Sequence, residues 1–282
     1  MRAASLADGR LHLQHGPIDL VVAAWGAEGE VAAAYRQAVA AFDGLLEELV
    51  AELPVLRRPV GSDTAMPAGP VARRMVAAVL PHRCVYITPM AAVAGAVADE
   101  VLARLLAGRD IARAYVNDGG DIAIHLGPGE SLRIGVVADL DAPAVEGMAV
   151  LTHDMPVRGV ATSGRGGRSF SRGIADAVTV LALDAAGADA CATLVANAVS
   201  IDSPKVTRRP ARLLDPDSDL GDIPVTVAVA PLDGAEVAAA LAAGAAEAER
   251  LRGAGHLAAA MLSLCGAVRL VGSPAGVLGR RA

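Results

Sequence analysis

The chain has 282 residues, of which 54% are hydrophobic and 20% charged, and its formal net charge is −6. This length and apolar content suffice for a large buried core, whereas no run approaches the roughly eighteen uncharged apolar residues that a membrane-spanning helix needs. The acidic balance and an aromatic content of 2% leave little material for a basic surface on which bases stack, so we expect neither a membrane nor nucleic acid as a partner.

The N-terminal segment and the cysteines indicate the compartment. Arg2, Asp8 and Arg10 come early in the chain, without the apolar stretch of a secretory signal, so we expect a cytoplasmic protein. Cys84, Cys191 and Cys265 lie far apart and form no Cys-x-x-Cys motif. This spacing predicts buried reduced thiols and argues against a disulfide framework or a structural zinc site.

Periodic patterns predict the elements of the first half of the chain. The turn signal at residues 15–17 predicts an opening hairpin, and apolar positions at helical spacing predict a long helix that Pro54 ends. The predicted strands are 11–13, 18–24, 83–88, 111–116 and 121–126, and the predicted helices are 30–53, 71–80 and 90–107.

The second half continues with strands and helices in groups. The predicted strands are 132–138, 149–151, 177–183, 225–229 and 268–271, and the predicted helices run from beyond Asp189 to Ser200, over 234–251 and over 255–265. Because there is no regular β-α-β alternation, we expect an α+β fold with mixed or antiparallel sheets and packed helices. Neither a Rossmann nor a P-loop glycine motif occurs. The length fits a single domain over residues 1–282, or two intimate lobes.

The most informative motifs are Gly159-Val-Ala-Thr-Ser-Gly164 and Ala188-Asp-Ala-Cys-Ala-Thr193. Asp189 and Thr193 are four positions apart, so on a helix they share one face and can offer two oxygens to a hard cation. Side chains of these types at a helix start also act as caps, which is the alternative reading. Asn117-Asp-Gly-Gly120 is typical of a tight turn or a bulge.

These segments, in this order, resemble the signatures of the ApbE-like superfamily, together with Gly95-Ala-Val-Ala-Asp99 and Val178-Thr-Val-Leu-Ala182. The resemblance covers roughly residues 85–200 and implies a T-fold-like architecture. The founding activity of that superfamily is FAD:protein FMN transfer. Its Gly-Gly-Asp segment lies by the nucleotide site, and its Ala-Thr-Ser-Gly segment lies at the active centre.

The resemblance implies a set of site residues. Asp189 and Thr193 would bind Mg²⁺, with the backbone carbonyl near Ala161 as a third ligand. Asp176 is the candidate catalytic group, which would accept a proton. The residues expected to bind FAD, or another flavin or nucleotide, are Asp99, Asn117, Gly119, Gly120, Asp121, Thr162, Ser163, Gly164, Arg165 and Arg168.

The chain also departs from the superfamily pattern. Ala94 replaces a lysine, and Arg172-Gly-Ile-Ala-Asp-Ala177 replaces a His-Ile-Ile-Asp-Pro-x-Thr-Gly segment. The overall pattern, including the opening Asp8-Gly-Arg-Leu-His-Leu13 and Gly16-Pro-Ile-Asp-Leu20, resembles the uncharacterised branch of the superfamily more closely. Two hypotheses remain: a Mg²⁺-dependent protein that cleaves or transfers at the pyrophosphate of a bound flavin nucleotide, or a non-catalytic cofactor-binding or scaffold protein with a degenerate pocket. The expected ligand is small and anionic, and a homo-oligomer remains open.

Overall fold

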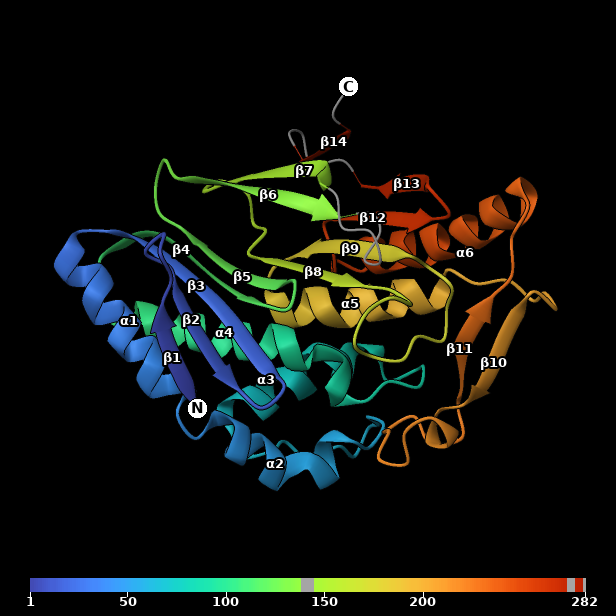
Figure 1. The fold of residues 1–282 in the computed structure, drawn as a ribbon, viewed down its shortest axis with the longest axis horizontal. Coiled ribbons are helices and arrows are strands. Elements are labelled where there is room, and N and C mark those ends of the chain that lie inside the picture. The colour runs from blue at the N-terminus through green and yellow to red at the C-terminus, as the bar shows by residue number, and fades with distance from the viewer. Residues whose placement is uncertain (138–144, 273–276, 281–282) are drawn as a thin grey trace. The chain divides into compact units, whose positions relative to one another are not determined.

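The computed structural model describes residues 1–137, 145–272 and 277–280 (Figure 1). The chain divides into two compact units. Unit 1 comprises Met1–Leu132, Thr152–Ala161 and Ala182–Ala190, and unit 2 comprises Arg133–Leu151, Thr162–Leu181 and Cys191–Ala282. Each unit is described separately below.

Unit 1 is built on an antiparallel sheet. Its strands are β1 (Arg2–Ser5), β2 (Leu11–His15), β3 (Ile18–Gly26), β4 (Ile111–Asp118), β5 (Asp121–Leu126) and the first residues of β8 (Gly159–Ser163). Along β3 and β4, Leu20, Val22 and Val116 are fully buried, while the alternate residues Val21 and Tyr115 are partly exposed. This period of two buries one face of the sheet.

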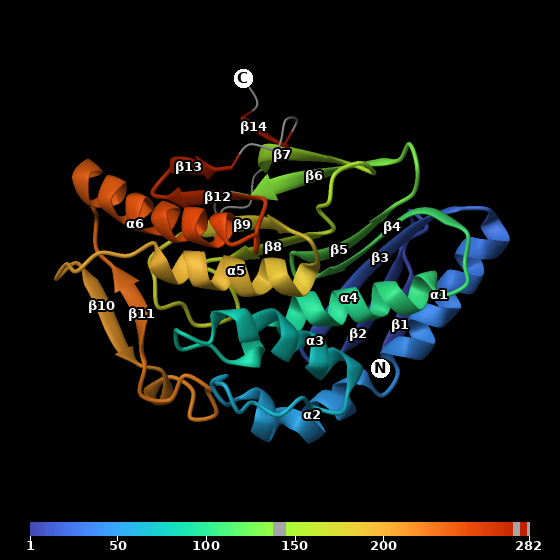
Figure 2. The same cartoon turned by 180° about the vertical axis from the view of Figure 1, so that it is seen from behind.

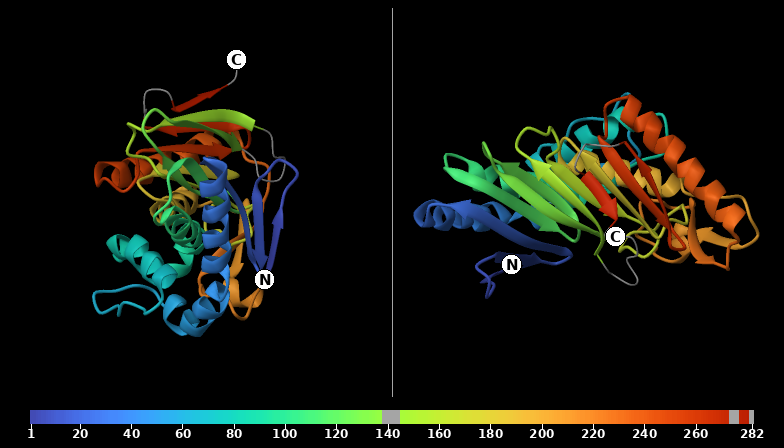
Figure 3. Two further views of the ribbon diagram at one scale, coloured as in Figure 1. Left: turned by 90° about the vertical axis from the view of Figure 1, so that its left-hand side faces the viewer. Right: turned by 90° about the horizontal axis from the view of Figure 1, so that it is seen from above.

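Helices cover that face of the sheet. They are α1 (Glu28–Phe42), α2 (Leu45–Leu56), α3 (Pro70–Val79) and α4 (Val93–Leu106), with short 3₁₀ turns η1 (Leu80–His82) and η2 (Pro89–Ala92). Figure 2 and the left view of Figure 3 show α1 and α4 on the same side of β3 and β4, and both helices contact the sheet. Small buried residues such as Ala34, Ala38 and Ala98 let the helices lie close to their neighbours.

Three predictions for unit 1 are wrong. The helix expected over 30–53 is two helices, because Gly44 adopts a left-handed φ of 80° and ends the first one. Pro54 does not end the second helix, because it lies in the last turn of α2. The strand expected over 83–88 is a loop, in which Val85 is 47% exposed, because its apolar residues find no neighbouring strand among the described residues.

Unit 2 contains three groups of strands. Strand β12 (Ala259–Leu264) pairs antiparallel with β9 (Ala177–Ala182) and with β13 (Ala267–Val271). Strand β10 (Val206–Pro210) pairs with β11 (Pro224–Val229), and β7 (Val145–Thr152) lies between β6 (Ser131–Val137) and β14 (Val277–Arg280). The helices are α6 (Gly234–Gly253), the C-terminal part of α5 (Ala185–Ala198) and the short turn η3 (Ala211–Leu213). In the right view of Figure 3, α6 runs beside β12 and β13, which it contacts.

The helix expected over 255–265 is wrong, because residues 259–264 form β12, and all six are buried. A short continuous apolar run fits a buried helix and a central strand equally well, so its partners decide. The other predicted elements of unit 2 are present, although α5 begins four residues before Asp189 and residue 138 of one predicted strand lies outside the described residues. The sequence patterns do not predict strands β1, β10 and β14.

The predicted α+β class with antiparallel sheets and packed helices is confirmed. Within the described ranges, no helix is both long enough and apolar enough to span a membrane.

Candidate functional site

In unit 1, a carboxylate from each of the helices α4 and α5 accepts hydrogen bonds from the N-terminal N–H groups of the other helix. Asp99 of α4 accepts hydrogen bonds from the backbone N–H groups of Ala185 (3.1 Å) and Ala186 (2.9 Å), which open α5. Asp189 of α5 accepts one from the N–H of Gly95 in the first turn of α4 (3.1 Å). Each carboxylate therefore satisfies N–H groups that the other helix leaves without intrahelical partners.

The close approach of these helices depends on Gly95. A Cβ atom at this position would overlap the backbone of Ala185. The glycine of the Gly95–Asp99 motif thus brings the two N-termini near enough for the reciprocal hydrogen bonds.

The pKa values of Asp99 and Asp189 are both raised, which favours the neutral form of each carboxylate. Burial raises the pKa of Asp99 to about 6, although the hydrogen bonds from Ala186 and Ala185 oppose the change. Burial, and next the negative charge of Asp121, raise the pKa of Asp189 well above its usual value. Asp118 adds a further negative charge that acts in the same direction, so a nearby cation would favour the ionised form of Asp189.

The turn between β4 and β5 explains why two more carboxylates act on Asp189. Gly119 and Gly120 adopt φ values of 62° and 115°, and Asn117 accepts the Gly120 N–H through its Oδ1 (2.8 Å). Asp118 and Asp121 are paired across this turn. The tight turn predicted for residues 117–120 is confirmed. Asp118, which is 4% exposed, was missed as a site residue, and the pairing across a two-residue turn is the signal that identifies it.

In unit 2, Asp176 is the centre of a hydrogen-bonded cluster. Arg165 donates from Nε (3.0 Å) and Nη2 (2.9 Å) to its Oδ1, and the backbone N–H of Cys265 donates to its Oδ2 (2.5 Å). Gly164 lies against the backbone of Asp176, where a Cβ would overlap its carbonyl. The Thr162 and Thr179 hydroxyls are 2.9 Å apart, so Thr162 is tied to the neighbouring strand β9.

The remaining predicted residues are distributed as follows. Ala161 is buried in β8, Ser163 and Thr193 are partly exposed, and Arg168 lies exposed in the loop after β8. In that loop Ser171 is buried, and Arg172 donates its N–H to Asn197 Oδ1 (2.9 Å).

The predicted residues are divided between the two units. Unit 1 holds Asp99, Asn117, Gly119, Gly120, Asp121, Ala161 and Asp189, and unit 2 holds Thr162, Ser163, Gly164, Arg165, Arg168, Asp176 and Thr193. Asp189 and Thr193 are one turn apart along α5, and the division between the units falls between them.

The carboxylates of Asp118 and Asp121 are near enough to Asp189 to raise its pKa, and such oxygens suit a hard cation. A carboxylate has about four lone-pair sites, so the hydrogen bond from Gly95 leaves acceptor capacity on Asp189. Carboxylate, hydroxyl and carbonyl oxygens are the ligands that Mg²⁺ prefers, and it keeps several waters. Across the described part of the chain, no three His, Cys, Asp or Glu side chains are grouped as a ready metal cage. A cation here would depend on mixed oxygen ligands and on the phosphates of a ligand.

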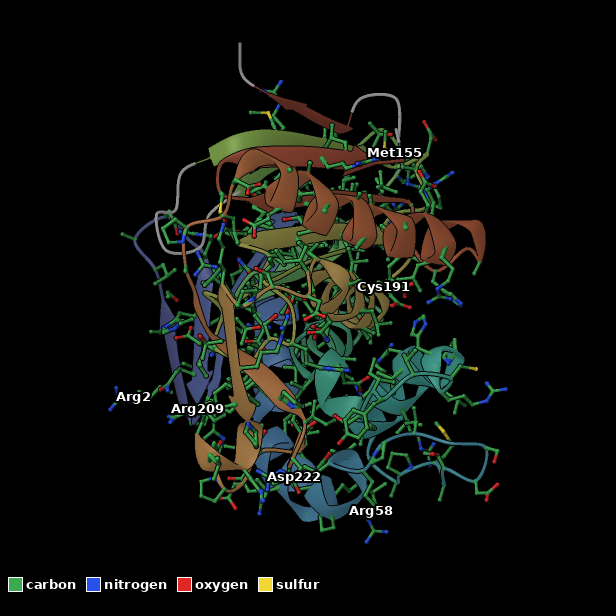
Figure 4. All side chains as sticks on the ribbon, turned by 90° about the vertical axis from the view of Figure 1, so that its right-hand side faces the viewer. Arg2, Arg58, Met155, Cys191, Arg209 and Asp222 are labelled. Carbon is green, nitrogen blue, oxygen red and sulfur yellow. The ribbon has the colours of Figure 1, made fainter. Side chains whose placement is uncertain are left out.

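The histidines and cysteines have structural contacts. His125 and His153 each place a ring nitrogen on a backbone carbonyl, of Ile111 (3.0 Å) and Leu126 (2.8 Å). All three cysteines are free, as predicted for thiols, but only Cys191 is buried; its side chain lies on α5 (Figure 4). The expected burial of Cys84 and Cys265 is wrong, because both lie in loops or turns at the surface.

Comparison with known proteins finds archaeal relatives of this chain. It is 40% identical over 141 residues to a UPF0280 protein of Methanothrix thermoacetophila, a match that covers 48% of this chain and 55% of that protein. It is 38% identical over 117 residues to a UPF0280 protein of Archaeoglobus fulgidus, covering 40% and 45%. The chain thus spans about half the length of the curated relatives it matches.

Among solved structures, the flavin transferase ApbE of Vibrio cholerae aligns over 96% of this chain and 98% of that chain, at 12% identity and a TM-score of 0.41. The family described as AbpE bacteria matches residues 3–270, and the chain belongs to this family.

Proposed function

We propose that this protein binds a flavin or a related nucleotide together with Mg²⁺, and that it cleaves or transfers at the pyrophosphate of that ligand. Membership of the AbpE bacteria family supports the proposal. The observation that carries the proposal is the raised pKa of Asp189, which is buried near two other carboxylates.

Asp189 combines burial with like charges. Its pKa is raised by burial and by the charges of Asp121 and Asp118, so an ionised Asp189 is unfavourable without a compensating cation. Mg²⁺ would offset these charges, with Asp189, the Thr193 hydroxyl and the Ala161 carbonyl as its protein ligands. When bound, it would supply charge neutralisation at the phosphate oxygens.

The glycine turn suits a nucleotide neighbour. Gly119 and Gly120 have no side chains, so a ligand can approach their backbone closely, while Asn117 holds the turn in shape. In the proposal, this turn and Asp121 contact the nucleotide, with Asp99 holding the start of α5 behind them.

Arg165 and Arg168 supply positive charge in unit 2. The Arg165 side chain is 38% exposed and is held by Asp176, so it can bind a phosphate oxygen from a fixed position. Arg168 in the same loop supplies a second positive charge. The proposed binding groups beside them are Thr162, Ser163 and Gly164. In the reaction, a water or an acceptor hydroxyl forms a bond to the phosphorus of the FMN half, and the bond from that phosphorus to the AMP oxygen breaks. The proton of the nucleophile passes to bulk water, and AMP leaves with the bridging oxygen.

A second function is favoured by specific observations. The superfamily's lysine is replaced by Ala94, and the reciprocal capping gives Asp99 and Asp189 a structural purpose without any ligand. The alternative is therefore a cofactor-binding or scaffold protein that does not turn its ligand over.

The test is to incubate the purified protein with FAD, with and without Mg²⁺, and to quantify bound FAD and released FMN and AMP by chromatography. Mg²⁺-dependent FMN and AMP support the enzymatic proposal, and bound FAD without products supports the binding protein. The absence of both binding and products contradicts the flavin proposal.

Matched variants assign the activity to Asp189. Asp189→Asn keeps the size of the side chain and its ability to accept the Gly95 N–H but removes the charge, so we expect the Mg²⁺ dependence to be lost. Asp222→Asn is the control, because it removes the same charge from an exposed pair with Arg212 in unit 2. Equal behaviour of the two variants would contradict a metal ligand at Asp189.

A further inference from the structure

The Asp176 carboxylate joins two segments of unit 2 that are distant in sequence. Its Oδ1 accepts two hydrogen bonds from Arg165, and its Oδ2 accepts the N–H of Cys265, 89 positions away. The Asp176 N–H donates to the carbonyl of Ser263 (3.0 Å), and the Arg165 N–H donates to that of Ala175 (2.9 Å). Main chain and side chain therefore hold the loop after β8 and the β12–β13 turn together.

These contacts do not suit a proton acceptor. The Asp176 side chain is only 9% exposed, and three hydrogen bonds occupy most of the four or so lone-pair sites of a carboxylate. Arg165 is the more exposed partner at 38%. A ligand therefore reaches Arg165 more readily than it reaches Asp176.

We propose that Asp176 is a positioning residue: it fixes Arg165 for a phosphate group of the ligand and couples Arg165 to the β12–β13 turn. The Arg165 part rests on the proposed function, whereas the link between Asp176 and the turn does not.

The turn itself makes the coupling measurable. Cys265 and Gly266 connect β12 to β13, and Cys265 has a φ of 50°, a region that non-glycine residues rarely adopt. The Cys265 N–H that binds Asp176 belongs to this constrained residue. Burial and the charge of Asp176 raise the pKa of the Cys265 thiol, and the charge of Arg165 lowers it. The ionised fraction of the thiol therefore depends on both side chains.

The Cys265 thiol is also accessible. It is exposed and lines a cavity of about 530 Å³ beside the first turns of α6, with Val237, Leu241 and Arg269 among its neighbours. A Cys84→Ser background removes the other exposed thiol, and Cys191 is buried. The rate at which a small disulfide reagent such as DTNB labels the protein then reports on Cys265.

The first experiment compares labelling rates at pH 8 in that background. Asp176→Asn leaves one oxygen for the donors of Arg165 and Cys265, and it removes a negative charge that raises the pKa of the Cys265 thiol. More of the thiol is then ionised, so we expect labelling to accelerate about three- to tenfold. Asp222→Asn, which removes an exposed charge elsewhere in unit 2 (Figure 4), is expected to keep the original rate. Equal rates for the two variants overturn the link between Asp176 and the turn.

The second experiment adds inorganic pyrophosphate without Mg²⁺, so that Asp189 is not involved. Pyrophosphate brings negative charge to Arg165, and we expect it to slow Cys265 labelling in the Cys84→Ser protein but not when Arg165→Gln is added. Calorimetry then measures pyrophosphate affinity for Asp176→Asn, Arg165→Gln and the double variant. Each single change is expected to weaken binding about tenfold, and the double variant no more than that, because Asp176 acts through Arg165.

The outcomes separate the two proposals. Additive losses in the double variant, or binding that is unchanged in Asp176→Asn, overturn the positioning of Arg165. If the unmodified protein does not bind pyrophosphate, the phosphate-gripping role of Arg165 fails, and with it that part of the proposed function. The labelling rates of Asp176→Asn still decide the link to the turn, because they need no ligand.

Discussion

The positive φ of Cys265 limits which residue types fit this position without strain. The hairpin between β12 and β13 has two connecting residues with φ values of 50° and 76°, as in the turn type that favours Asn followed by Gly. Gly266 meets this preference, whereas cysteine at the first position is strained.

We therefore expect Cys265→Asn to increase the free energy of unfolding by about 0.5–1 kcal/mol, because asparagine tolerates the left-handed region and keeps the N–H to Asp176. Urea denaturation measures the change. Cys84→Ser, an exposed cysteine without a positive φ, is the control and is expected to stay within about 0.5 kcal/mol. A less stable Cys265→Asn protein would show that the thiol itself stabilises the turn.

The raised pKa of Asp99 predicts that the free energy of unfolding depends on pH. Its pKa is raised from 3.8 to about 6, so the folded protein favours the protonated form relative to the unfolded chain. The stability that this group contributes is therefore present below about pH 4 and is lost as the pH rises through 6.

Asp99→Asn removes this titration. Between pH 4.5 and 7.5, we expect the stability of the unmodified protein to fall by about 2 kcal/mol relative to the variant, from a shift of roughly two pKa units. Urea denaturation at both pH values gives the difference, and Asp154→Asn at an exposed position is the control. The idea fails if the difference between Asp99→Asn and the unmodified protein is the same at both pH values.

At the scale of elements, the contact between α4 and α5 rests on one missing side chain. Gly95 lies where any Cβ would meet the Ala185 backbone, which cannot move without displacing the start of α5. The same contact aligns Asp189 with the first turn of α4.

Gly95→Ala is expected to lower the free energy of unfolding by about 2–3 kcal/mol, as overpacking against backbone does. Gly29→Ala in α1 is the matched control, because a Cβ there meets no described atom within 4 Å, and alanine favours helix. Chemical denaturation of both variants tests the contact. A Gly95→Ala protein as stable as Gly29→Ala would mean that α4 and α5 can separate at little cost.

The elements also show where sequence patterns succeed. Strands β4 and β5, with their glycine turn, were predicted because alternation and turn signals are local. Residues 259–264 were assigned to a helix because a short apolar run carries no period, and only pairing with β9 and β13 makes it a strand. The single helix expected over 30–53 failed for a local reason: Gly44 permits a left-handed conformation that a periodic pattern does not reveal.

For the whole molecule, acidic charge is the dominant electrostatic feature. The net charge is −6, and Asp118 and Asp121 add their negative charges to the environment of Asp189. A divalent cation that bound there, and not to the unfolded chain, would stabilise the folded state by an amount that grows with the logarithm of its concentration above the Kd.

We expect saturating Mg²⁺ to raise the melting temperature of the unmodified protein by several degrees, from about 2–3 kcal/mol of binding linkage. Asp189→Asn is expected to melt at least as high without Mg²⁺, because a repelled charge is gone, and to gain nothing from Mg²⁺. Asp222→Asn should respond like the unmodified protein. Scanning calorimetry decides, and an equal Mg²⁺ response in all three proteins would place the cation elsewhere.

The sequence by itself determined the α+β class, the glycine turn at residues 117–120 and the one-turn spacing of Asp189 and Thr193, because each depends on a few neighbouring residues. The ordered motifs also identified the superfamily. Only the tertiary structure decided that Asp99 binds the start of α5, that Asp189 binds Gly95 and that Asp176 holds the Cys265 turn. These partners are 86, 94 and 89 positions apart in the chain, and local preferences carry no information about which distant N–H groups a carboxylate will meet.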